Sequence, residues 1–357
     1  MSWPGYASQQ AVERRDFLSK VTALLGAATL PVTAVIPTDP EPWRRLATLL
    51  RRHGPADGAA VDHVERVTMA LQSLGPTLVS PRAILGPATE HLAAIRALLR
   101  GSLRASLRAR LTSVAADTSG FVGWLHWDLD DPAGAAAAFR AGLDAAREAG
   151  DRPLAAYLAG SAACQPPYRE TPRHRLGRLR ALSGSAATPA TRVWLAAKEA
   201  DAHALLGDAA GCLRALDRAE RALDAAGTDQ GPRRPRFDAI DRAWLDGERG
   251  ASLARLGRTA EARAYLAPAL EALGPAGERD WLWLGTALAS THLADGEPEE
   301  ACRVAVGVLE RASRMELGPV LQVVRGLRRE LGAHGPAQAV GELDERLRDA
   351  AGTSAAS

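Results

Sequence analysis

The chain has 357 residues, of which 46% are apolar and 24% are charged, and its formal net charge is +2. These proportions are typical of a globular protein, and the length fits either two ordinary domains or one elongated repeat domain. The small net charge excludes the strongly basic balance on which nucleic-acid-binding domains depend, so no direct nucleic acid binding is expected.

The first distinctive stretch, residues 13–37, reads ERRDFLSKVTALLGAATLPVTAVIP and has two interpretations. Arg14 and Arg15, followed by an apolar run, match a twin-arginine export signal. Asp16 inside the motif and the break at Pro31 favour a linker helix instead. We therefore expect a cytoplasmic protein, with export through the twin-arginine signal as the alternative. No later run approaches the ~20 apolar residues that a membrane span requires, so no membrane partner is expected.

From Trp43 onward the sequence predicts helices throughout. Apolar residues recur at three- and four-residue spacing in segments that end in glycine, and no stretch alternates convincingly as a strand does. Breaks rich in glycine and proline separate these segments. We expect upstream helices within 43–100, a divergent helix pair within 154–182 and a closing pair within 319–350.

Four helix–turn–helix units share one spacing of small residues. The first helix of each unit holds a small residue, and the second helix holds another one twelve positions later. The pairs are Gly123 with Ala135, Ala200 with Cys212, Gly250 with Ala262, and Ala289 with Ala301, and four positions further on come Phe139, Leu216, Leu266 and Ala305. Two antiparallel helices that cross closely need small side chains at the contact. The spacing is that of a tetratricopeptide repeat and predicts an all-α fold, a right-handed solenoid of antiparallel helix pairs.

One segment, residues 117–163, resembles the repeat region of large actinobacterial regulators. The resembling features are the pair Gly123 and Trp124, the acidic turn at Asp130 and Asp131, and the stretch AGDRPLAAYLAG. In that family an Xre-type helix-turn-helix is followed by a tetratricopeptide-like sensor domain. The resemblance implies a sensor region, here without the DNA-binding domain. We accordingly divide the chain into a linker or twin-arginine-like segment (1–40), a helical repeat domain (41–351) and a disordered tail (352–357).

Tryptophans occupy a recurrent position in the first helices of the units. Trp194, Trp244 and Trp283 each lie six residues before the small residue of their unit, at a position that tends to face the concave groove of such arrays. Trp124 and Trp127 lie later in the first unit, at positions that also tend to face inward. One interpretation is an aromatic groove for a peptide or a small apolar ligand, because tryptophans are favoured anchors in recognition surfaces. The other is that these rings fill gaps between stacked helices.

Histidines and cysteines give no sign of a metal or redox site. His126, His203 and His292 share one position, three residues after the small residue, where packing between the two helices of a unit is expected and metal binding is not. Cys164, Cys212 and Cys302 are widely spaced and are expected to be buried apolar residues.

Motifs that would indicate catalysis are missing from the sequence, so we expect no enzyme, no catalytic residues, no metal and no cofactor. The function expected is a non-enzymatic regulatory scaffold that binds a peptide, a small signal molecule or a partner protein, in transcriptional or developmental regulation. Two alternatives stay open: a regulator that acts on DNA through a missing or partner-supplied helix-turn-helix, and an exported binding protein.

Overall fold

The computed structural model describes residues 57–74, 80–164, 171–183, 188–225, 240–273, 277–332 and 337–355. Residues 13–37 lie outside these ranges, so both interpretations of that stretch stay predictions. Within the described ranges all regular secondary structure is helical, as the sequence predicted. The helices are α3 (Gly58–Leu74), α4 (Pro81–Leu99), α5 (Ala105–Asp128), α6 (Pro132–Glu148), α7 (Arg152–Cys164), α8 (Pro172–Ser183), α9 (Pro189–Leu205), α10 (Ala209–Asp224), α12 (Arg242–Arg255), α13 (Thr259–Leu273), α14 (Glu278–Ala294), α15 (Pro298–Met315), α16 (Gly318–Leu331) and α17 (Ala337–Ala355).

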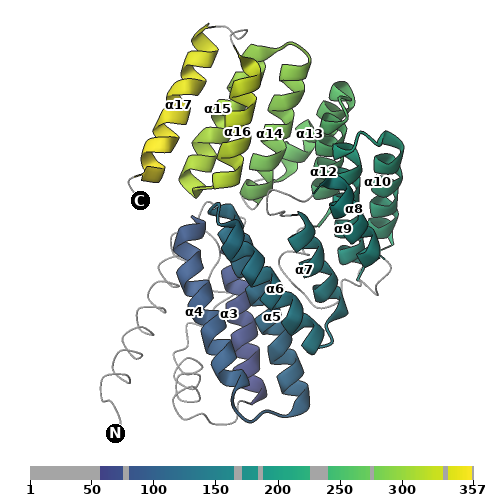
Figure 1. Cartoon of the computed structure of the whole chain (residues 1–357), viewed down its shortest axis with the longest axis vertical. Coiled ribbons are helices and arrows are strands. Elements are labelled where there is room, and N and C mark those ends of the chain that lie inside the picture. Colours follow the sequence, from purple (N-terminus) through teal and green to yellow (C-terminus); the bar gives the residue numbers. More distant parts are fainter. Residues whose placement is uncertain are drawn as a thin grey trace.

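These helices form an all-α solenoid of antiparallel pairs, which confirms the predicted fold class (Figure 1). The pairs are α5 with α6, α7 with α8, α9 with α10, α12 with α13, α14 with α15, and α16 with α17. The last pair is the loosest, because α17 packs mainly against α15. The divergent pair predicted within 154–182 is α7 and α8, and the closing pair predicted within 319–350 is α16 and α17. Helix α17 extends to Ala355, into the segment predicted as a disordered tail, 352–357.

The small residues lie where the helices of each unit cross. A β-carbon added at Gly123 would lie 3.0 Å from the ring of Phe139, and one added at Gly250 would lie 2.7 Å from Cγ of Leu266. Ala200 is fully buried at the corresponding crossing of α9 and α10. The repeat spacing therefore has the physical cause proposed from the sequence: the second helix packs too closely for a larger side chain.

The turn inside each unit needs one residue with a positive φ. Gly207, Gly257 and Gly296 supply it with φ between 70° and 75°. The first unit has Asp130 there, at φ 59°. Glycine adopts this conformation without the steric cost that a β-carbon brings, so the first unit carries local backbone strain that the other three avoid.

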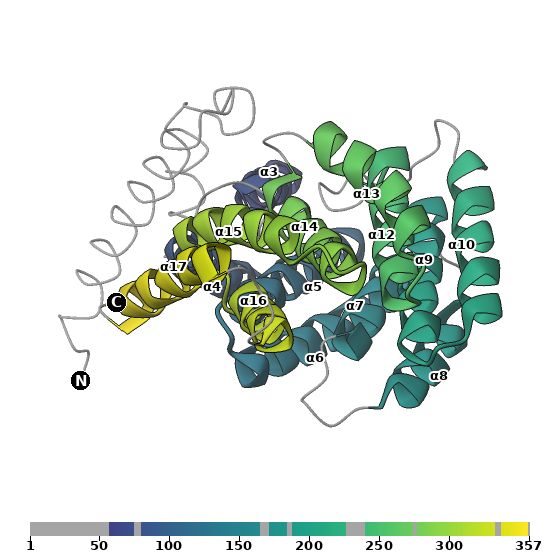
Figure 2. The same ribbon diagram turned by 90° about the horizontal axis from the view of Figure 1, so that it is seen from above.

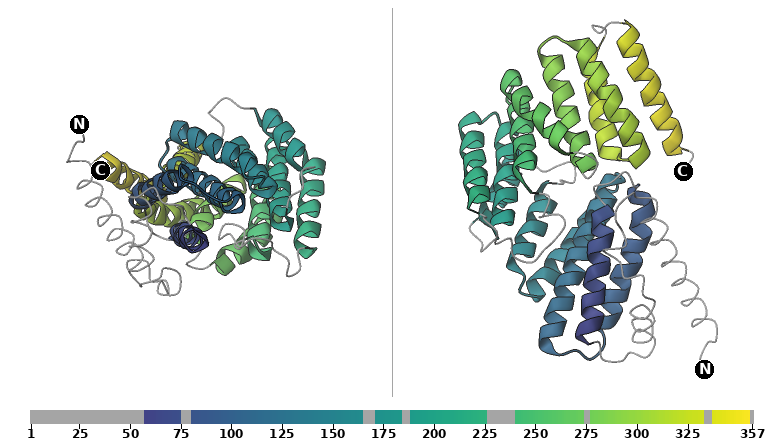
Figure 3. Two further views of the ribbon diagram at one scale, coloured as in Figure 1. Left: turned by 90° about the horizontal axis from the view of Figure 1, so that it is seen from below. Right: turned by 180° about the vertical axis from the view of Figure 1, so that it is seen from behind.

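The first helices of the six pairs, which we call the inner helices, form a closed ring of contacts. Helix α5 contacts α7, and the contacts continue through α9, α12, α14 and α16, which returns to α5. In Figure 1 the group α14–α17 stands above the group α3–α6, and Figures 2 and 3 show the chain curling through α7–α13 to connect them. The end of α5 and the start of α14 consequently meet, although they lie far apart in the sequence.

The three cysteines are buried to different degrees within the helix pairs. Cys212 and Cys302 are buried free thiols and Cys164 is partly buried, as expected for small apolar residues.

Among the described helices, none combines the length and the apolar character that crossing a membrane would require.

Candidate functional site

The five predicted groove tryptophans lie in two different packing clusters. Trp194 and Trp244 are 6% and 8% exposed and belong to the largest apolar cluster, against which Trp124 and Trp127 pack as partly buried rings. Trp283 packs against a separate cluster built by α14–α17. Four of the five therefore contact one apolar cluster, and the two most buried rings contribute mainly to packing.

An aromatic row connects three successive inner helices. The indole Nε1 of Trp124 on α5 donates a hydrogen bond of 2.8 Å to the hydroxyl of Tyr157 on α7. The Tyr157 ring in turn lies 4.9 Å, centroid to centroid, from Trp194 on α9. Phe139 packs edge-on against Trp124 at 5.7 Å. Sequence reasoning missed Tyr157 because it lies in the divergent pair, where the repeat alignment does not reach.

Two cations lie over the faces of these tryptophans. The Cζ atom of Arg279 is 4.8 Å from the ring centroid of Trp124, and Nζ of Lys198 is 5.5 Å from that of Trp244. These distances fall within the range of cation–π attraction. Asp280, which follows Arg279 on α14, interacts electrostatically with Lys198, Glu248 and Asp128, so the two cation–π contacts lie near one another.

Each of these cations also pairs with a carboxylate. Arg279 makes a forked contact with Asp128, with Nη2 to Oδ1 at 2.8 Å and Nε to Oδ2 at 3.0 Å. Lys198 donates to Glu248 at 2.5 Å. Charged groups in partly buried positions are costly unless they are paired in this way.

The buried charges shift one another's ionisation. Burial is the largest single influence on Lys198 and would lower its pKa, but Glu248 together with the nearby Cys164 and Asp201 leaves the pKa above its usual value. Burial likewise acts against Arg279, whose pKa Asp128 raises. The pKa of Asp280 is raised, first by burial and then by the nearby Glu248. We call this set the inner site: Trp124, Asp128, Tyr157, Trp194, Lys198, Trp244, Glu248, Arg279 and Asp280.

A second charged group borders the inner site. Asp201 on α9 receives contacts from Arg175 at 2.5 Å and from Arg255 at 2.7 Å. Burial raises the pKa of the nearby Cys164 thiol. A thiol with a raised pKa is protonated near neutral pH and is a poor nucleophile.

The three equivalent histidines serve the turns of their units. His126, His203 and His292 each place Nδ1 near the carboxylate five positions later, at 2.8 Å, 2.7 Å and 2.6 Å respectively. In the first two units that carboxylate also caps the next helix by accepting from a backbone N–H at 2.8 Å. The sequence signal for this arrangement is a histidine, an acidic residue five positions on and, in two units, a glycine three positions further.

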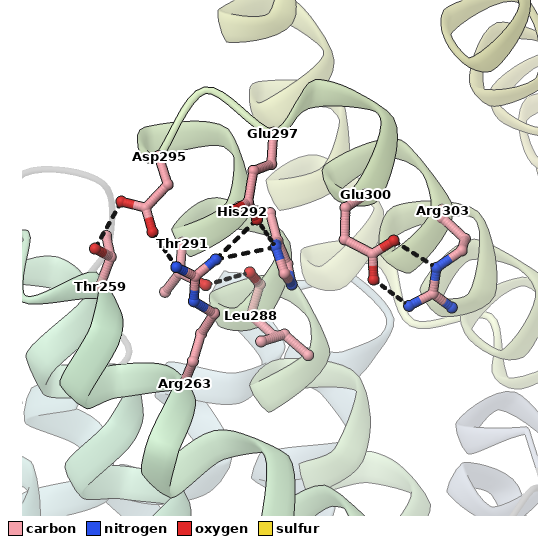
Figure 4. Close-up of polar contacts among 9 residues, drawn as sticks. All are labelled: Thr259, Arg263, Leu288, Thr291, His292, Asp295, Glu297, Glu300 and Arg303. Carbon is pink, nitrogen blue, oxygen red and sulfur yellow. Dashed lines mark hydrogen bonds and ion pairs between the residues drawn. The ribbon is translucent and has the colours of Figure 1, made fainter.

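The fourth unit shows a variant of the same turn (Figure 4). Glu297 replaces the aspartate, and Arg263 of the preceding pair bridges Glu297 and Asp295. Thr259 adds a hydrogen bond of 2.7 Å to Asp295. These contacts join neighbouring units to one another. Over the described ranges, no group of three or more histidine, cysteine, aspartate or glutamate side chains is placed to hold a metal ion.

A cavity of about 500 Å³ lies apart from the inner site, between α3, α5 and the turn from α6 to α7. Its lining includes Glu65, Thr68, Met69, Arg110, Asp117 and Asp151. Arg110 is already paired with Glu65 at 2.5 Å. None of the five predicted tryptophans lines this cavity.

Comparisons with known proteins leave the family open. No family model matches the chain, and no curated protein matches it. Among solved structures, the chain is similar to one described as the crystal structure of the P58(IPK) TPR domain, with 16% identity over 96% of this chain and 98% of that one. The TM-score of 0.21 is too low for this likeness to support any conclusion about the present chain. The resemblance to Xre-type regulators therefore stays a prediction.

Proposed function

We propose that this protein is a non-enzymatic scaffold that binds a peptide or a partner protein at its inner site. The proposal extends to a regulatory role in the cytoplasm, for which the sequence resemblance of residues 117–163 is the support. Binding at the inner site would favour one curvature of the solenoid, because a ligand shifts a conformational equilibrium only through different affinities for the two states.

The observation that supports this function most strongly is the chemistry of the inner helices. A solenoid core needs only apolar side chains where its helices stack. Here the inner helices instead carry aromatic rings with cations over them and partly exposed ion pairs, such as Lys198 with Glu248, whose side chains are 21% and 19% exposed. Aromatic and arginine side chains are enriched at the centres of protein interfaces.

The inner site also draws on many inner helices at once. Trp124, Tyr157 and Trp244 come from α5, α7 and α12, and Arg279 comes from α14. A ligand that contacts several of these helices is sensitive to their relative positions. The inner site could therefore couple binding to the shape of the whole ring.

Affinity capture from the source cells tests the proposal when it compares matched variants of the full chain. Trp127→Ala and Asp280→Asn change partly buried groups at or beside the inner site, and Leu205→Ala changes a leucine that is 42% exposed elsewhere. We expect the first two variants to lose a specific partner that wild type and Leu205→Ala retain. Equal recovery by all four proteins, each folded by circular dichroism, would place the binding surface elsewhere.

A further inference from the structure

Arg279 occupies a site with the features of a guanidinium receptor. The Asp128 carboxylate meets the guanidinium with two parallel contacts, and the Trp124 ring covers one face at 4.8 Å. A planar fork of donors matches a carboxylate in this way, and the aromatic face suits arginine better than lysine.

The receptor side of this contact is held in place by its own part of the chain. Asp128 and Trp124 both lie in the last turns of α5, and Asp128 is 4% exposed. Trp124 is fixed by its hydrogen bond to Tyr157 and by the edge of Phe139. Neither support comes from α14, so the position of the Trp124 ring does not depend on Arg279.

Arg279 itself lies in α14, 151 positions after Asp128 in the sequence. It is the second residue of α14, where the positive end of the helix dipole disfavours a cation. Asp128 is the last residue of α5, where the negative end of the dipole disfavours an anion. Each charge is therefore unfavourable at its end of its own helix, and the ion pair between Arg279 and Asp128 offsets both costs.

Another polar contact, at the junction between α3–α6 and α14–α17, is more exposed to solvent. Glu316, between α15 and α16, accepts from Ser80 at 2.6 Å and from Arg82 at 3.2 Å. The Arg82 side chain is 59% exposed, and exposed ion pairs contribute little to stability.

Backbone strain also gathers at the junction. Among the described residues, the two non-glycine residues with positive φ are Asp130 and Glu316, and both lie here. Gly318 approaches so closely that an added β-carbon would be 2.8 Å from Cβ of Asp130. Residues held in such a conformation cost free energy, and separation of the junction would release it.

We propose that Arg279 is an internal occupant of an arginine-binding site, which a partner's arginine takes over when the junction opens. This inference rests on the proposed function and names the chemistry of the partner. Removing Arg279 leaves the buried Asp128 charge uncompensated, and only an entering cation restores its pair. The partner segment therefore presents an arginine side chain, and Arg279 holds the site closed until that segment arrives.

Small probes test this site in the full chain. N-acetyl-arginine amide carries the guanidinium, and N-acetyl-citrulline amide has nearly the same shape without the charge. In Arg279→Gln, where the internal occupant loses its charge, we expect the arginine probe to bind at least about tenfold more tightly than the citrulline probe, since a charged hydrogen-bonded pair is lost with citrulline. Titration calorimetry measures both affinities.

Three further proteins make the result specific. The double variant Arg279→Gln with Asp128→Asn should lose the preference for arginine. Wild type should bind the arginine probe more weakly than Arg279→Gln, with Arg279→Lys between them because lysine cannot form the fork. If Arg279→Gln does not fold, wild type and Arg279→Lys still give the comparison.

The proposal is overturned if Arg279→Gln binds both probes equally, if the double variant keeps the preference, or if wild type and Arg279→Lys bind the arginine probe with the same affinity. These probes involve no partner protein. A negative result would reject the arginine site alone, while the scaffold function is judged separately by the capture experiment.

Discussion

Gly211 lies so close to His203 that a β-carbon at position 211 would be 2.2 Å from Nδ1 of the histidine ring. The same β-carbon would be 2.2 Å from Oδ2 of Asp208, which accepts from the Gly211 backbone N–H through its other oxygen. The imidazole, the capping carboxylate and the glycine therefore form one packed turn. The histidine has a structural role because its Nδ1 faces this carboxylate.

This relationship predicts that Gly211→Ala is destabilising, although alanine normally favours a helix. The clash should lower the free energy of unfolding by about 1–3 kcal/mol, the usual cost of overpacking. Gly177 in α8 is the matched control, since an added β-carbon there has nothing within 4 Å. Gly177→Ala should raise stability by about 0.4–1 kcal/mol. Urea unfolding measures both, and a stabilised Gly211→Ala would refute the packed turn.

The junction contact predicts strong coupling between Arg279 and Asp128. Removing either partner, as in Arg279→Ala or Asp128→Ala, should cost about 3–5 kcal/mol, because the other charge stays partly buried and unpaired. The double variant should cost clearly less than the sum of the two single variants. A double-mutant cycle by chemical unfolding gives this coupling energy, and strictly additive losses would show that the pair does not hold the junction.

The tryptophans should separate into two groups by their burial. Trp194→Ala and Trp244→Ala remove buried rings and should each cost about 3–5 kcal/mol of stability. Trp127→Ala and Trp283→Ala remove partly exposed rings and should cost distinctly less. Thermal unfolding distinguishes the groups. Similar losses for all four would mean that Trp127 and Trp283 are structural in the same sense as the buried pair.

Two buried histidines predict a loss of stability in acid. Burial lowers the pKa of His63 to about 4 and that of His91 to about 3, from an ordinary value of 6.5. Between each lowered pKa and 6.5, the unfolded chain binds more protons than the folded chain. The free energy of unfolding therefore rises with pH over this range. Stability should therefore fall as the pH drops below 6.5 and should continue to fall through pH 4 toward pH 3.

A histidine substitution checks this origin of the pH dependence. His91 contacts the Thr68 hydroxyl through Nε2 at 2.9 Å, and His91→Gln keeps a polar group there without the titration. The variant should lose stability less steeply than wild type from pH 6.5 to pH 4. His174→Gln, which changes an exposed histidine, is the control. Parallel pH curves for wild type and His91→Gln would contradict the assignment.

The repeat architecture was predictable because it depends on local spacing. Gly123 with Phe139 and Gly250 with Leu266 lie within one helix pair, so their sequence separation records the packing directly. The divergent pair α7 and α8 was located by its breaks, but Tyr157, which belongs to the proposed binding site, was not. A residue outside the aligned units carries no positional signal.

The closure of the ring could not be derived in the same way. It is the sum of small rotations between successive pairs, which local periodicity does not fix. Arg279 and Asp128 meet only when those rotations add up. A signal was present in hindsight, because a cation in the first turn of α14 and an anion at the end of α5 both oppose the helix dipole.

The separation between α4 and α16 tests the closed ring most directly. Thr89 and Gln322 are exposed on these helices, and spin labels introduced there without cysteine chemistry report the distance across the junction by pulsed electron resonance. We predict one narrow distance distribution in wild type and an added, longer population in Arg279→Gln. A broad distribution in wild type, or identical distributions in the two proteins, would contradict a ring held closed by Arg279 and Asp128.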